Sequence, residues 1–118
     1  MTWQEFLTER PIAVIATVSA DGMPHAVPVE VFVHENRVYC WGHRTSLKAR
    51  NVAETSVAAL TAYKGHTRAV VRGPARLLAA EDPLYDVATE GILAKYKREE
   101  TYGNDCVIQI TPTKVVFD

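Results

Sequence analysis

The sequence has little of what several common classes of protein require. It contains two cysteines among 118 residues, and aromatic residues make up 8% of the chain. Two cysteines exclude the dense disulfide framework of a small secreted domain, and no apolar run approaches the roughly 20 residues of a membrane-spanning helix. Repeats, linkers and low-complexity segments are absent. These absences favour a single globular domain over residues 1–118, with a hydrophobic fraction of 47% to supply its core.

The two cysteines and four histidines carry no motif. Cys40 and Cys106 are far apart, and each lies in an apolar segment. This is typical of buried free thiols in a reducing compartment, so we expect a cytoplasmic protein; a disulfide between the two is the alternative. The histidines lack the spacing of metal ligands, and we expect no metal site.

Positive charge is concentrated in one third of the chain. The net charge is −1, yet residues 37–76 contain eight Lys and Arg residues and one acidic residue, Glu54. A near-neutral protein with one basic third is expected to have a local anion-binding site rather than a generally cationic surface. For Arg72 and Arg76, which alternate along a predicted strand, the alternative is that they face solvent.

The pattern of apolar residues predicts a mainly β fold. Segments rich in alternating or β-branched residues predict six strands, at 12–19, 24–34, 37–42, 56–63, 66–78 and 105–111, with a last extended piece at 114–117. Asp21-Gly22 predicts a hairpin turn. Pro28 indicates an edge strand, a bulge or a ligand-facing interruption. Strands of this kind predict a six-stranded antiparallel barrel, closed or nearly closed, with α-helices.

Three helices are predicted between these strands, at 2–9, from Thr45 to near Glu54, and at 83–98. The first begins with a possible capping box formed by Thr2 and Glu5. The third begins with Asp82 as its cap, followed by a proline at the first helical position.

The junction between the third predicted strand and the second helix carries the most informative motif. The strand stops at Gly42, and the helix starts after Thr45. A helix start exposes unpaired N–H groups and the positive end of the helix dipole, which suits a phosphate. Hydroxyl and cationic side chains at the same place would add donors: Arg44, Thr45, Ser46 and Lys48. The motif therefore predicts a phosphate-bearing ligand, with Ser46 as the helix cap and Lys48 as the phosphate-binding cation, whereas a nucleophilic pair of Ser46 and Lys48 is the alternative.

With these elements in order, the chain resembles the pyridoxamine 5′-phosphate oxidase-like family of flavin- and deazaflavin-binding split β-barrels. The resemblance extends over nearly the whole chain. The matching motifs are Ala16-Thr17-Val18, Asp21 to His25, Val27 to Val29, the Ser-x-Lys-x-x-Asn-Val pattern of Ser46, Lys48, Asn51 and Val52, Arg72 to Leu77, and Ile110 to Val115.

The resemblance implies a homodimer with two cofactors, FMN or a deazaflavin, in clefts at the subunit interface. It implies that Ser46 and Lys48 hold the phosphate, and that Asn51 of the same motif also belongs to the cofactor site. The other implied contacts are the ring along Val27, Pro28 and Val29, the phosphate or ribityl chain beside Trp41 and Gly42, and the ring or phosphate at Arg68. Leu47 stands where true pyridoxamine phosphate oxidases carry Arg, which favours a different substrate.

These observations predict an oxidoreductase that binds FMN or a deazaflavin and acts on a small organic substrate. No catalytic residue is evident, because flavin chemistry belongs mainly to the cofactor. The alternatives are a non-enzymatic FMN-binding electron carrier, a haem-binding protein, and a nucleic-acid-binding barrel that uses Trp41, Tyr63 and the basic third. We expect neither a nucleic acid nor a membrane as partner.

Overall fold

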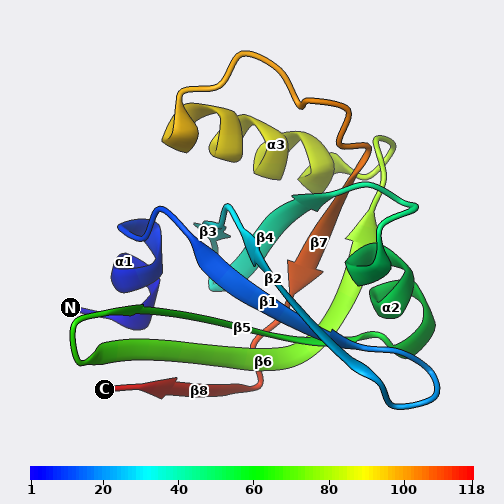
Figure 1. Cartoon of the computed structure of the whole chain (residues 1–118). Coiled ribbons are helices and arrows are strands. Elements are labelled where there is room, and N and C mark those ends of the chain that lie inside the picture. Colours follow the sequence, from blue (N-terminus) through cyan, green and yellow to red (C-terminus); the bar gives the residue numbers. More distant parts are fainter.

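The computed structural model describes residues 1–118 and shows one strongly curled antiparallel sheet with three helices (Figure 1). The strands are β1 (Ala13–Val18), β2 (Pro24–Val29), β3 (Phe32–His34), β4 (Arg37–Gly42), β5 (Val57–Lys64), β6 (Thr67–Leu78), β7 (Cys106–Ile110) and β8 (Lys114–Phe117). Their order is β2-β1-β5-β6-β7-β4-β3, with β8 paired to β6. The predicted fold class, a mainly β split barrel with helices, is therefore confirmed.

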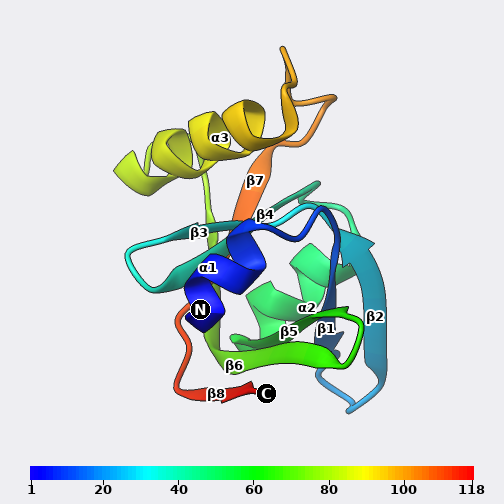
Figure 2. The same cartoon turned by 90° about the vertical axis from the view of Figure 1, so that its left-hand side faces the viewer.

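The three helices are α1 (Trp3–Thr8), α2 (Leu47–Thr55) and α3 (Pro83–Tyr96). The Thr2–Glu5 capping box and the Asp82 cap form as predicted. In the barrel, α1 and α2 lie at opposite ends, and α3 covers the face made by β4 and β7 (Figures 1 and 2). No helix has both the length and the apolar character needed to cross a membrane.

The strand β6 joins the two halves of the sheet. Its first part pairs with β5 and β8, and its last part pairs with β7. Gly73 lies where the partners change, and a Cβ at this position would stand 2.2 Å from the carbonyl oxygen of Thr111. Only a residue without a side chain allows this close approach, so the Arg72–Leu77 motif includes the bend that closes the sheet.

Two apolar clusters fill the interior. The larger cluster lies inside the curled sheet and includes Leu7 from α1, Val52 from α2 and Ile15 from β1. The smaller cluster lies between the sheet and α3 and includes Tyr39 and Trp41 from β4 with residues of α3. Alternate residues of β4 therefore face different clusters: one face of the strand packs inside the curled sheet, and the other packs against α3.

The sheet has eight strands rather than six, because the segment predicted as 24–34 is interrupted and the piece at 114–117 pairs as β8. The interruption lies at Val31, whose backbone N–H donates to the Tyr96 hydroxyl at 2.9 Å. The ammonium group of Lys95 donates to the Val31 carbonyl at 2.7 Å. Side chains of α3 thus replace a strand partner at this residue. Burial, with the charge of Arg10, lowers the pKa of Lys95 to about 8.

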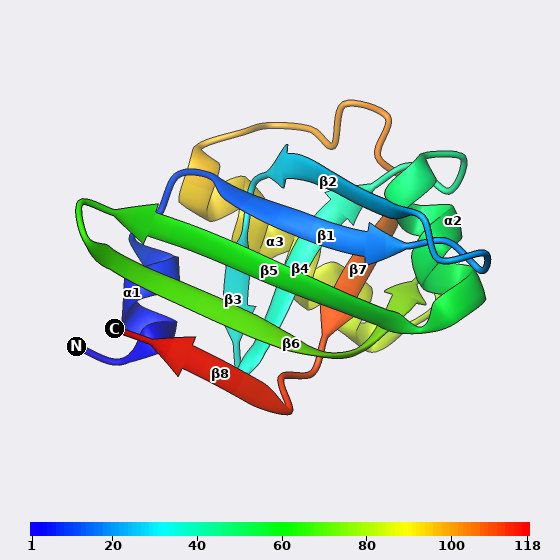
Figure 3. The same cartoon turned by 60° about the horizontal axis from the view of Figure 1, so that its bottom comes forward.

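The outer face of β2, β1, β5 and β6 is covered by no other element (Figure 3). It contains a shallow hollow of about 550 Å³ with mostly apolar walls, including Ala16, Pro24, Val57 and Pro74. Val57 is 45% exposed. An uncovered apolar face of this kind marks a contact surface or a ligand-binding groove.

Candidate phosphate and cofactor site

The end of β4 and the first turn of α2 meet as the sequence predicts. A Cβ added to Gly42 would lie 3.5 Å from Lys48 Cε and 3.8 Å from Ser46 Oγ. These are ordinary contact distances, so the end of the strand lies directly beside the first turn of the helix. We call this place the α2 corner, defined by Gly42, Ser46, Leu47 and Lys48.

Ser46 is the N-cap of α2, as the motif predicts. Its hydroxyl accepts the N–H of Ala49 at 3.4 Å and donates to the His43 carbonyl at 2.7 Å. The hydroxyl hydrogen is therefore already used within the turn. By contrast, the N–H groups of Leu47 and Lys48 have no partner in the chain. The unpaired donors that a phosphate requires at this corner are thus backbone groups.

The loop from His43 to Thr45 is fixed by a residue that the motif did not indicate. The Arg44 N–H donates to Asp105 Oδ1 at 2.8 Å, and the Asp105 N–H donates to the Gly42 carbonyl. The side chains of Arg44 and Thr45 are exposed and make no hydrogen bond. Asp105 precedes β7, which pairs with β4, and only this long-range pairing brings it to the corner.

Lys48 is the cation closest to the corner, and it forms no ion pair. The charge of Lys48 acts on the pKa values of two nearby buried thiols, those of Cys40 and Cys106. Burial raises the pKa of Cys40 to about 12, and the Lys48 charge opposes this shift. Burial also raises the pKa of Cys106, whose thiol donates to the Gly42 carbonyl at 3.3 Å. Both cysteines are free, as predicted, and in this protonated form they are not nucleophiles.

Two other predicted contacts have side chains that serve the fold. Asn51 is 2% exposed, and its amide donates to the Thr17 hydroxyl at 3.1 Å, which joins α2 to β1. Trp41 packs in the cluster beneath α3, and its ring N–H donates to the Thr89 hydroxyl at 3.4 Å. Because adjacent residues of a strand point to opposite faces, Trp41 points away from Gly42 and the corner.

The residues predicted to lie along the cofactor ring are on β2, an edge strand that pairs only with β1. Val27 and Val29 point into the larger core cluster, whereas Pro28 is exposed on the opposite face. The structure thus favours the edge-strand interpretation of Pro28. Along its free edge β2 has backbone groups without a strand partner, which are available to a ligand.

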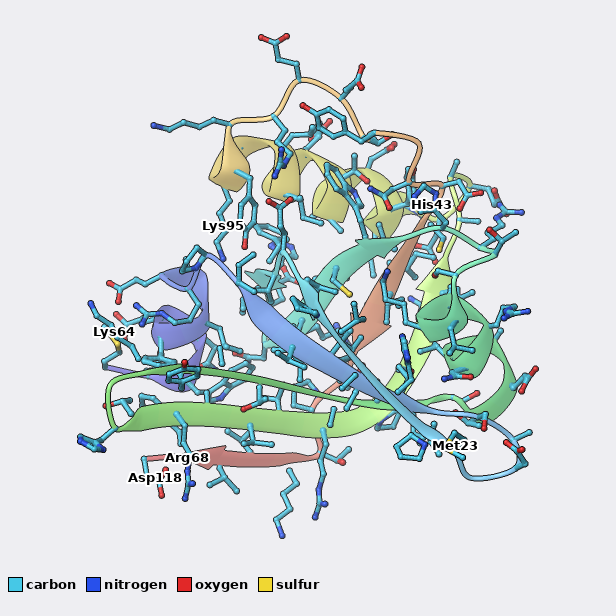
Figure 4. The ribbon with its side chains drawn as sticks, in the orientation of Figure 1. Met23, His43, Lys64, Arg68, Lys95 and Asp118 are labelled. Carbon is cyan, nitrogen blue, oxygen red and sulfur yellow. The ribbon has the colours of Figure 1, made fainter.

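Arg68 lies far from the α2 corner. Figure 4 shows Arg68 beside Asp118 on one side of the molecule, and His43, next to the corner, on the other side. The Arg68 Nε donates to Asp118 Oδ1 at 3.0 Å, and both side chains are largely exposed. The fold therefore brings Gly42, Ser46 and Lys48 together and does not bring Arg68 to them.

The family of the chain follows from its whole length. The family described as pyridoxamine 5′-phosphate oxidase matches residues 2–117. The chain therefore belongs to the pyridoxamine 5′-phosphate oxidase-like family, and the resemblance of its motifs is confirmed. A comparison with curated protein sequences finds no match.

Solved structures with the same fold have different activities in their names. An F420 reductase has a TM-score of 0.77 at 20% identity, with 98% of each chain covered. A putative pyridoxamine 5′-phosphate oxidase from Listeria innocua has a TM-score of 0.78 at 19% identity, covering 96% of this chain and 92% of that one. The haem storage protein HutZ from Vibrio cholerae has a TM-score of 0.76 at 13% identity, covering 96% and 89%. At these identities the comparison shows the fold alone.

Proposed function

We propose that this protein is an oxidoreductase that binds FMN or a deazaflavin and acts on a small organic substrate. The α2 corner carries this proposal. It combines two unpaired backbone N–H groups, at Leu47 and Lys48, with a cation that has no carboxylate partner. Fixed N–H donors and an unpaired cation are the groups that hold a phosphate monoester at a helix start.

The second part of this proposal concerns the position of the cofactor ring relative to the α2 corner. We place the ring along the free edge of β2, where unpaired backbone donors and acceptors can bind its polar edge. The Asn51–Thr17 bond joins α2 to β1, the strand that pairs with β2, so corner and edge have a fixed separation. A bound flavin would supply the electron or hydride transfer, while the chain binds and orients it.

We propose that a second copy of the chain covers the uncovered outer face and completes the cofactor cleft. The apolar hollow around Val57 and Pro74 supports a contact with another subunit. Arg68 lies on β6 of the same layer, so within this proposal it would contact the cofactor held by the other subunit. Val57→Glu is expected to convert a dimer to a monomer, because it places a charge in the contact, as measured by sedimentation velocity. A dimer that persists would contradict this interface.

The test is a titration of purified protein with FMN, with F420 and with haem, followed by absorbance and fluorescence. Binding of FMN or F420 at micromolar concentration supports the proposal and selects the cofactor. Binding of haem alone would contradict it. Turnover of a panel of small substrates by the loaded protein then separates an oxidoreductase from an electron carrier, which would bind the flavin without substrate turnover.

A further inference from the structure

A second hollow lies away from the α2 corner, between the sheet and the first turn of α3. Its volume is about 440 Å³, and its walls include Arg37, Arg76 and Gln109. Ser56, at the opposite end of α2 from Ser46, lies on its rim. Ten helical residues correspond to about 15 Å, so the hollow and the corner are separate places.

Each arginine of this hollow donates through its Nε to a neutral partner. The Arg76 Nε donates to Gln109 Oε1 at 2.8 Å, and the Gln109 amide donates to the Tyr39 hydroxyl at 3.0 Å. Gln109 is 3% exposed. The Arg37 Nε donates to the Thr111 hydroxyl at 3.4 Å. These contacts orient both guanidinium groups without neutralising their charge.

Most of the donors in the hollow remain free. One carboxylate is present, and Asp82 Oδ2 lies 3.1 Å from Arg76 Nη1. Arg37 has no carboxylate partner, and both of its Nη groups and Nη2 of Arg76 make no hydrogen bond. The hydroxyl of Ser56 is also unpaired. The arrangement is a set of oriented donors with an excess of positive charge.

We propose that this hollow, the Arg37–Arg76 pocket, binds the oxyanion group of a small ligand, a phosphate or a carboxylate. The planar fork of a guanidinium group matches the paired oxygens of both groups. The volume lies within the range of small-molecule pockets. Because Asp82 keeps one amino group of Arg76, the anion binds mainly to Arg37 and to the remaining amino group of Arg76. No residue of the α2 corner lines this pocket, so it is distinct from the proposed phosphate site, although Pro74 borders both the pocket and the uncovered outer face.

The experiment follows the Nε–Hε signals of the arginines by ¹⁵N–¹H NMR while inorganic phosphate, or separately acetate, is added to the full chain. We expect saturable shifts at Arg37 and Arg76. Arg37→Gln should weaken the binding about tenfold or more, since it removes charge-assisted hydrogen bonds. The tighter of the two anions identifies a phosphate-bearing or a carboxylate-bearing ligand.

Two control variants make the result specific. Arg50→Gln removes an exposed arginine of α2 and should leave the binding unchanged. Arg37→Lys keeps the charge without the fork, and should bind more weakly than the natural chain but more tightly than Arg37→Gln. The proposal is overturned if the shifts at Arg37 and Arg76 do not saturate, or if Arg37→Gln and Arg50→Gln behave alike.

Discussion

Two cations were predicted to contact the cofactor, Lys48 at the α2 corner and Arg68 where β6 pairs with β8, and their surroundings differ. We call the second place the β6–β8 edge, defined by Arg68 and Asp118. At the corner, Lys48 has no carboxylate partner and stands beside two unused backbone N–H groups. At the edge, Arg68 pairs with Asp118 and is largely exposed. Lys48 thus has free donors around it, whereas Arg68 has its charge already compensated.

The difference shows what turns a basic residue into part of a binding site. A charge binds an anion strongly where the fold leaves it unpaired and adds fixed donors. An exposed ion pair at a strand edge contributes little, because solvent screens it. The α2 corner therefore satisfies the conditions for a phosphate site better than the β6–β8 edge does.

The largest expected effect comes from Lys48→Ala. Removing this unpaired cation from the first turn of α2 should weaken binding of a flavin nucleotide by about tenfold to a hundredfold, the equivalent of a hydrogen bond to a charged group. Fluorescence quenching of FMN or the deazaflavin measures this. Arg50→Ala, on the same helix, is the matched control and should bind as the natural chain does. Equal affinity of the two variants would remove Lys48 from the site.

A smaller effect separates the two roles of Ser46. Ser46→Ala should lower the free energy of unfolding by about 1 kcal/mol, because the helix loses its cap. It should weaken ligand binding less than Lys48→Ala, since the hydroxyl hydrogen already bonds to His43. Urea unfolding and ligand titration measure the two quantities.

Ser46→Asp should keep the stability of the helix while lowering the affinity for the ligand. Aspartate is a good helix cap, so the free energy of unfolding should stay near that of the natural chain, while its negative charge should repel the phosphate. Unchanged affinity in this variant would show that no anion approaches the cap.

The smallest effect is expected at the edge. Arg68→Gln should lower the free energy of unfolding by at most about 1 kcal/mol, as is typical of an exposed ion pair. Its effect on cofactor affinity should be smaller than that of Lys48→Ala. A loss as large as at Lys48 would mean that Arg68 is a principal contact of the cofactor held by a second subunit.

The sequence predicts local features of the site well and distant ones poorly. The cap at Ser46 and the strand end at Gly42 depend on neighbouring residues, and both are as predicted. The approach of Asp105 to the corner depends on pairing between β4 and β7, which no local pattern contains. The break between β2 and β3 at Val31 likewise depends on hydrogen bonds with Lys95 and Tyr96 of α3.

Side-chain direction explains the remaining differences within the fold. The motif includes Trp41 and Asn51, but alternation along β4 turns the first toward α3, and the second is buried between α2 and β1. A motif defines positions near a site without defining which side chains enter it. The family match supports the order of the elements, and the contacts within the structure show the role of each residue.

The most direct test of the central claim is a ¹⁵N–¹H NMR titration of the full chain with FMN, and separately with the deazaflavin, that follows backbone amides. If the phosphate binds at the α2 corner, the N–H signals of Leu47 and Lys48 should shift most, because these two donors have no partner in the free chain. Largest shifts at Arg68 and Asp118, with none at Leu47 and Lys48, would contradict the account.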